Sequence, residues 1–213
     1  MSASGPVVRM TAVGRSYGHG AQRVVALHDV DLDLYAGEVV ALVGRSGSGK
    51  STLCHVLAGV EPATSGSVEV DGRSLPDEPD WQDVALLPQR LGLAPELTVA
   101  ENAFLPCWVR GENGEAAVLD LLGLADVAGR RAGATSLGEQ QRTAIARVLS
   151  TGPRVVVMDE PTGHQDDDNV ERVRRALDLA RSRGAAVLVA THDERIVRSA
   201  DRVVRLESGR VVA

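Results

Sequence analysis

Residues 44–52 have the types and spacing that could bind the phosphates of a nucleotide. They match G-x-x-x-x-G-K-[ST], the pattern of a phosphate-binding loop. Glycines let the backbone curl so that several N–H groups point at one anion, and a helix beginning near Gly49 adds the positive end of its dipole. We expect Lys50 to reach the β- and γ-phosphates and the Ser51 hydroxyl to hold Mg²⁺. The residues predicted to form this loop are Gly44, Arg45, Ser46, Gly47, Ser48, Gly49, Lys50, Ser51 and Thr52.

A second group with defined chemistry follows an apolar run later in the chain. Residues 155–158 are apolar and are followed directly by Asp159 and Glu160. Beside a phosphate-binding loop, the first acid can hold Mg²⁺ through water, and the second can polarise an attacking water molecule. In isolation, the same acids would be a solvated pair at the end of a strand. The loop upstream favours the catalytic interpretation.

Length and composition limit the class of protein. The chain has 213 residues, of which 44% are hydrophobic, enough for one α/β domain with a small subdomain. The net charge of −6 and the pI near 5.4 argue against nucleic-acid binding. No run approaches 18 apolar residues, and residues 1–6 lack the features of a signal peptide, so we expect a cytoplasmic protein. Cys54 and Cys107 are too few for a disulfide framework or a metal site.

Hydrophobic periodicity predicts strands that alternate with helices, which is typical of a largely parallel sheet covered on both faces. The first third of the chain instead predicts a small antiparallel sheet, with residues 14–20 as a loop that holds Tyr17. Thr98 and Glu101 have the spacing of a capping box that opens a helix. The predicted strands are 7–13, 23–27, 30–34, 39–43, 67–70, 84–87, 155–158, 186–190, 202–206 and 211–212, and the other predicted helices are 53–58, 115–122, 139–149, 170–183 and 194–200.

With these motifs placed, the chain resembles the ATP-binding subunit of ABC transporters over nearly its whole length. Residues 135–142, with the sequence TSLGEQQR, are similar to the signature segment of that family, in which LSGGQ precedes QQR. The resemblance implies that this segment of one subunit covers the ATP held by its partner subunit. It assigns the contacts with that ATP to Ser136, Gly138 and Glu139.

The sequence departs from the signature pattern at Thr135, Leu137 and Glu139. Leu137 replaces a glycine, and a leucine cannot adopt a positive φ cheaply. Glu139 brings a negative charge close to a polyphosphate. Both changes would weaken the contact with the partner's nucleotide.

The same resemblance assigns roles to residues elsewhere in the chain. It implies that Tyr17 stacks on adenine and that Gln89 contacts Mg²⁺. It implies that His192 contacts the γ-phosphate and orients water together with Glu160. Asp166 matches the end of the family's loop after the acidic strand.

Residues 97–106 resemble the segment that receives a coupling helix of the membrane subunit. The similarity is strongest to the branch that releases lipoproteins and exports macrolides. Phe104, Cys107 and Trp108 either contribute to that docking groove or pack the helical subdomain.

The resemblance implies one ABC ATPase domain over residues 1–213, with a P-loop NTPase core, an N-terminal antiparallel β-subdomain and a helical subdomain over about residues 90–135. We expect an ATPase subunit that binds Mg²⁺ and ATP, pairs with a second ATPase subunit as a homo- or heterodimer, and drives an integral membrane permease. It would lie on the cytoplasmic face of the cell membrane and act in export. The alternatives are an ABC-type ATPase of DNA repair or translation, a small-molecule kinase, and a degenerate subunit that needs a more active partner.

Overall fold

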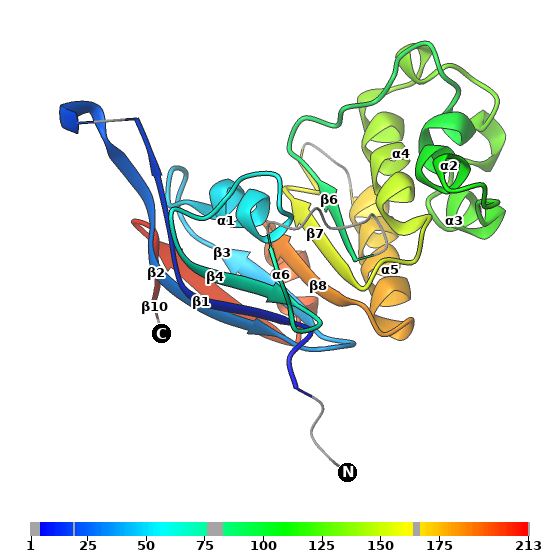
Figure 1. The fold of residues 1–213 in the computed structure, drawn as a ribbon. Coiled ribbons are helices and arrows are strands. Elements are labelled where there is room, and N and C mark those ends of the chain that lie inside the picture. Colours follow the sequence, from blue (N-terminus) through cyan, green and yellow to red (C-terminus); the bar gives the residue numbers. More distant parts are fainter. Residues whose placement is uncertain (1–4, 19, 76–82, 164–166, 213) are drawn as a thin grey trace.

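The computed structural model describes residues 5–18, 20–75, 83–163 and 167–212. These residues form two β-sheets flanked by helices (Figure 1). One sheet has four strands in the order β2-β1-β4-β5, and the other has six in the order β10-β9-β3-β8-β7-β6. The predicted combination of a mostly parallel sheet, an antiparallel β-part and covering helices is confirmed.

The strands and helices lie close to their predicted positions. The strands are β1 Val8–Tyr17, β2 Val24–Leu34, β3 Val39–Val43, β4 Ser65–Val70, β5 Arg73–Ser74, β6 Val84–Leu87, β7 Val155–Asp159, β8 Ala186–Ala190, β9 Arg202–Glu207 and β10 Arg210–Val212. The α-helices are α1 Lys50–Leu57, α2 Val99–Val109, α3 Ala116–Leu121, α4 Leu137–Leu149, α5 Asp167–Ser182 and α6 Glu194–Ser199. Short 3₁₀ turns are η1 Gly20–Gln22, η2 Ala125–Val127 and η3 Ala132–Ala134.

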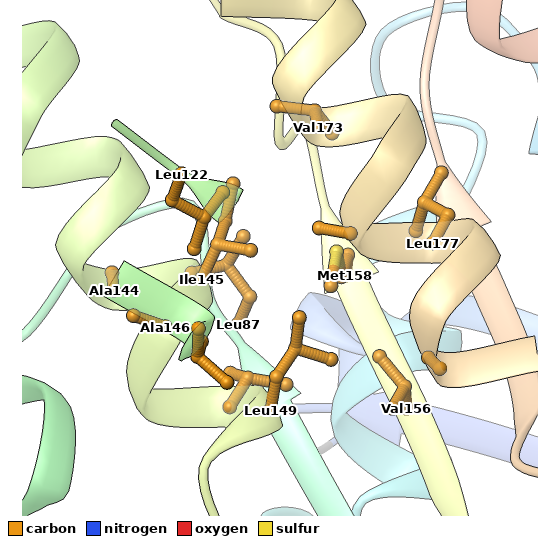
Figure 2. Packing of buried hydrophobic residues seen from close by; sticks show 14 of the residues in the cluster. Leu87, Leu122, Ala144, Ile145, Ala146, Leu149, Val156, Met158, Val173 and Leu177 are labelled. Carbon is orange, nitrogen blue, oxygen red and sulfur yellow. The ribbon is translucent and has the colours of Figure 1, made fainter. Parts of the chain in front are cut away.

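The parallel strands β7 and β8 separate two hydrophobic cores. Both strands are buried along their whole length, which fits their continuous apolar sequences. Val156 and Met158 of β7 pack against α4 and α5 on one face (Figure 2). Val155 and Val157 point to the other face, where α1 and the antiparallel sheet cover them. Because β3, β7 and β8 run parallel, their carboxyl ends lie along one edge, where ligands of such sheets bind.

Two strand boundaries that we predicted in the antiparallel sheet are wrong. Strand β1 continues through Tyr17, so residues 14–17 are strand and not loop, and β2 is one strand where two were predicted. The β1–β2 register shifts near Ala12 and Asp29, whose φ angles are +47° and +46°. Bulges of this kind let paired strands continue past an irregular residue, and Asp tolerates the left-handed region better than most.

The capping box predicted at the start of α2 is confirmed. The Glu101 N–H donates to Thr98 Oγ1 at 3.1 Å, and the Thr98 N–H donates to Glu101 Oε2 at 2.7 Å. Helix α4 begins at Leu137, two residues before the predicted start. Helices α2 and α3 lie beside α4, far from the β1–β2 hairpin in Figure 1.

Two of the three residues considered for a docking groove are interior. Phe104 and Cys107 are buried on α2, and the Cys107 thiol lies 3.3 Å from the Ser150 carbonyl oxygen. Trp108 is 47% exposed. Phe104 and Cys107 therefore pack the helical region. Within the described residues, none of the helices combines the length and hydropathy of a membrane span.

Candidate nucleotide-binding site

The phosphate-binding loop joins the end of β3 to the start of α1, as predicted. Gly49 is the N-cap of α1 with φ +106°, and no side chain caps that helix. A Cβ on Gly49 would lie 2.6 Å from the Ala26 carbonyl oxygen, and one on Gly44 would lie 2.3 Å from the Leu206 carbonyl oxygen. Glycine is therefore required at both positions. The N–H groups at the start of α1 are left available to an anion.

Lys50 bridges the loop with its ammonium group. Its Nζ donates to the Gly44 carbonyl oxygen at 2.9 Å and to the Arg45 carbonyl oxygen at 3.3 Å. The positive charge is thus held over the mouth of the loop, close to the amides that would bind phosphate.

Asp159 and Glu160 lie at the carboxyl end of β7, and their surroundings differ. Asp159 is 1% exposed, and its Oδ2 has no hydrogen-bond partner among the residues described. Glu160 has φ +54°, and its N–H donates to the Ala190 carbonyl oxygen at 2.8 Å. This left-handed backbone brings Glu160 Oε2 to 2.8 Å from Nδ1 of His192, whose side chain is largely exposed.

One cleft of about 750 Å³ brings most of the predicted site together. It is bordered by the phosphate-binding loop, by Gln89 after β6, by the end of β7 and by His192 after β8. The predicted residues that line it are Gly44, Ser46, Gly47, Gly49, Lys50, Ser51, Thr52, Gln89, Asp159, Glu160 and His192. The remaining loop residues Arg45 and Ser48 line a second cleft of about 900 Å³ on the other side of the loop.

The donor set in the first cleft fits Mg²⁺. The Ser51 hydroxyl, the Gln89 side-chain amide and the unpartnered Oδ2 of Asp159 supply oxygen atoms, which this ion prefers. The glycine cradle and the Lys50 ammonium supply the contacts for the phosphates.

Sequence reasoning missed one polar residue in this cleft. Gln141 of α4 is buried there, and its Nε2 lies 3.5 Å from the Glu160 carbonyl oxygen. Its position inside the signature-like segment was the available signal. Asp166, which the resemblance placed in the loop after β7, lies outside the described residues.

The signature-like segment forms the N-terminus of α4. Ser136 is the N-cap: its Oγ accepts from the Glu139 N–H at 3.2 Å and lies 2.9 Å from Glu139 Oε2, to which it donates. Hydrogen bonds from the Ser136 N–H and hydroxyl lower the pKa of Glu139, so this carboxyl stays charged. Leu137 is helical, not at positive φ, so the strain expected from this substitution is absent. Its side chain is 62% exposed at the edge of the cleft.

Tyr17 ends β1 near Thr52, a residue of the phosphate-binding loop. Its hydroxyl contacts Glu61 Oε2 and lies 3.5 Å from Thr52 Oγ1. The Arg15 guanidinium lies over the ring, 4.6 Å from its centroid. No local pattern indicates this role for Glu61, because 43 residues lie between it and Tyr17.

A glycine-rich loop between a buried strand and a helix, in a mostly parallel sheet with an acidic strand end nearby, defines a P-loop nucleotide-binding domain. Comparison with known proteins narrows the class. A family model described as "ABC transporter" matches residues 27–163. The chain belongs to the ABC transporter family and has the fold of its ATPase cassettes.

Two kinds of relative cover nearly all of the chain. The lipoprotein-releasing system ATP-binding protein LolD of Novosphingobium aromaticivorans is 40% identical over 97% of this chain and 98% of its own length. The macrolide export ATP-binding/permease protein MacB of Paracoccus denitrificans is 38% identical over 98% of this chain and 33% of its own length. The chain thus spans about a third of the MacB protein. The predicted similarity to the lipoprotein-release and macrolide-export branch is confirmed.

Solved structures show the same fold. The ATP-binding cassette MJ0796, in a dimeric post-hydrolysis state bound to ADP and Pi, has a TM-score of 0.89 and 29% identity, with 97% of each chain covered.

Proposed function

We propose that this chain is an ATP-hydrolysing subunit of an export transporter. Two subunits close head to tail around two Mg·ATP, and the cycle of closing and reopening drives a separate membrane permease from the cytoplasmic face. The convergence of the phosphate-binding loop, Asp159, Glu160, Gln89 and His192 in one cleft is the observation that supports hydrolysis. The printed functions of LolD and MacB support a transport role and the export direction.

The phosphate-binding residues bind and orient the nucleotide. Backbone N–H groups of the loop and the N-terminus of α1 bind the phosphate oxygens, and Lys50 exchanges its carbonyl partners for the β- and γ-phosphates. Ser51, Gln89 and Asp159 would hold Mg²⁺, which neutralises charge on the phosphate oxygens when bound. Tyr17 stacks on the adenine base.

Glu160 and His192 act on the attacking water. The Glu160 carboxylate accepts a hydrogen bond from that water and polarises it. Nδ1 of His192 lies 2.8 Å from Oε2, an oxygen without a hydrogen-bond partner among the described residues, so the exposed imidazole stands beside the carboxylate and can approach the γ-phosphate. The left-handed backbone at Glu160 directs its side chain into this contact.

A second subunit explains the position of the signature-like segment. Leu137 and Gln141 of this segment line the cleft of their own chain, whereas Ser136, Gly138 and Glu139 are outside the set of lining residues. They lie at the N-terminus of α4, where amides and a positive dipole can meet the phosphates of another copy. MJ0796, a structural relative, is known as a dimer.

Substitution of Glu160 tests this function. We expect Glu160→Gln to retain Mg·ATP binding, to lower the hydrolysis rate about 10²- to 10⁴-fold, and to accumulate as a dimer with ATP but not with ADP. Sedimentation velocity and phosphate release measure the two effects. Adding Lys50→Ala to this variant should remove nucleotide binding and the dimer, whereas Glu112→Gln, on the helical side of the molecule, should behave as wild type. Full hydrolysis by Glu160→Gln, or an ATP-bound monomer only, would contradict the proposal.

A second candidate function is a cassette that needs a different, more active partner subunit. The exposed Leu137 side chain at the start of α4 favours it, since this side chain stands beside the amides that would meet the partner's phosphates. The bond between the Ser136 hydroxyl and Glu139 favours it too, because that hydroxyl must be released to contact a phosphate.

A further inference from the structure

Glu61 lies at the centre of a polar cluster around Tyr17, which we call the Tyr17 cluster; its members are Arg15, Tyr17, His55 and Glu61. Oε2 of Glu61 accepts the Tyr17 hydroxyl and lies 3.2 Å from Nε of Arg15. Oε1 of Glu61 lies 3.4 Å from Nδ1 of His55. Both carboxylate oxygens are therefore used, and the side chain is held in one position.

The backbone around Glu61 is fixed to the helix that follows the phosphate-binding loop. The N–H groups of Val60 and Glu61 both donate to the His55 carbonyl oxygen of α1, at 3.0 and 3.2 Å. From the other side, Arg15 Nη1 donates to the Pro62 carbonyl oxygen at 3.0 Å. Glu61 thus connects α1 to Tyr17: its backbone is bonded to α1, and its carboxylate is bonded to the Tyr17 hydroxyl.

One face of the Tyr17 ring is covered, so a planar partner would have to stack on the opposite face. The covering group is the Arg15 guanidinium, 4.6 Å from the ring centroid, and it is held there by its bonds to Glu61 and Pro62. The hydroxyl edge lies 3.5 Å from Oγ1 of Thr52, which lines the nucleotide cleft. Tyr17 is outside the set of residues that line the cleft, and its ring is held beside the edge of the cleft at Thr52.

We propose that Glu61 is a positioning residue for recognition of the nucleotide base. It fixes the Tyr17 ring before the nucleotide arrives, with one face stacked under Arg15 and the opposite face presented to the base. This inference rests on the proposed function, in which Tyr17 stacks on adenine. A ring ordered in advance loses less conformational entropy on binding, so Glu61 raises affinity for the base and not for the phosphates.

Equilibrium binding of two ligands tests the role of Glu61. Mg·ATP contains the base, and magnesium triphosphate lacks it. We expect Tyr17→Ala to raise the Kd of Mg·ATP about tenfold, the factor for one lost stacking contact. Glu61→Ala and Tyr17→Phe should each raise it about threefold, because the ring remains but is no longer fixed. All three should leave the Kd of triphosphate unchanged, which also verifies that each variant is folded.

Two further variants separate positioning from a general structural effect. Glu61→Gln keeps an oxygen that accepts the Tyr17 hydroxyl, and it should restore most of the ATP affinity. Glu61→Ala should have no further effect in a Tyr17→Ala background, since the two residues act through one contact. Glu69→Ala, a carboxylate on β4 outside the Tyr17 cluster, is the matched control and should bind both ligands as wild type.

The outcomes distinguish the inference from the function on which it rests. If wild type binds no Mg·ATP, the proposed function fails. If Tyr17→Ala weakens ATP binding but Glu61→Ala does not, the function stands and the role of Glu61 is wrong. Equal weakening of ATP and triphosphate by Glu61→Ala would also overturn it, because the effect would then reach the phosphate-binding loop.

Discussion

Single residues in this site adopt backbone conformations that their neighbours enforce. Glu160 is a non-glycine residue at positive φ, a conformation that costs about 1–2 kcal/mol. Its N–H bonds to Ala190, and its carbonyl oxygen accepts from Gly163 at 3.3 Å, so the surrounding structure holds the strained turn. Strain of this kind concentrates where a side chain must point at a ligand. The contact between Glu160 and His192 is its result here.

Gly47 and Gly49 both have positive φ angles, but we expect alanine to destabilise the fold more at Gly49 than at Gly47. Gly49 (φ +106°) has no room for a Cβ beside Ala26, whereas a Cβ on Gly47 (φ +78°) would meet nothing within 4 Å. Both alanines suffer the left-handed penalty of about 1–2 kcal/mol, and Gly49→Ala adds a steric clash. Thermal unfolding without nucleotide should show a larger fall in Tm for Gly49→Ala than for Gly47→Ala. Equal Tm values would refute the close packing of the loop against β2.

At the scale of elements, the helices differ in whether a side chain caps their first turn. Helices α2 and α4 both begin with a complete capping box, whereas α1 has no side-chain cap. Each capping box occupies one amide of the first turn, that of Glu101 in α2 and that of Glu139 in α4. In α4 the amides of Leu137 and Gly138 are therefore the ones that could meet a partner's phosphate. Helix α1 follows the phosphate-binding loop, where its N-terminal amides are needed for an anion; α3 also begins without a side-chain cap, so a missing cap by itself does not mark a binding site.

The two capped helices allow a matched pair of substitutions. Thr98→Ala and Ser136→Ala each remove an N-cap and should each lower the free energy of unfolding by about 1 kcal/mol, measured in urea. Only Ser136→Ala should also lower ATP hydrolysis, since Ser136 is the cap assigned to the partner's nucleotide. A similar loss of activity in Thr98→Ala would show that destabilisation alone explains the effect.

At the scale of the whole molecule, β7 and β8 are shared by two hydrophobic cores, one on each face of the sheet. One core joins these strands to α2, α3, α4 and α5 (Figure 2), and the other joins them to α1 and the antiparallel sheet. The cleft at the carboxyl ends of the strands is therefore built from both layers. In the proposed head-to-tail dimer, α4 of a second subunit would lie over this cleft.

Substitution of Leu137 tests how strongly two identical chains associate in the presence of ATP. Its exposed side chain would lie between two copies, beside the amides that meet phosphate. If the second candidate function holds, Leu137→Gly should strengthen ATP-dependent self-association of Glu160→Gln by about tenfold, the equivalent of 1.4 kcal/mol. Sedimentation equilibrium with ATP measures the dimer constant. An unchanged constant would leave the homodimer as the supported assembly.

Local sequence determined the elements and the motifs of this protein. The glycine spacing of residues 44–52, the apolar runs of β3, β7 and β8, and the capping box at Thr98 depend on neighbours within a few residues, so pattern and propensity were sufficient. The P-loop core, the mixed sheets and the family followed from these motifs and are confirmed. The roles of the individual site residues stay predictions.

Tertiary structure decided which of these residues meet. The packing of the sheets and helices decides three features: the bulges that extend β1 to Tyr17, the contact of Glu160 with His192, and the placement of Gln141 in the cleft. The bond from Tyr17 to Glu61 is the clearest case, because neither residue's local sequence contains information about the other. Contacts between distant residues arise only when packing brings their elements together, and the packing of the whole chain fixes that geometry.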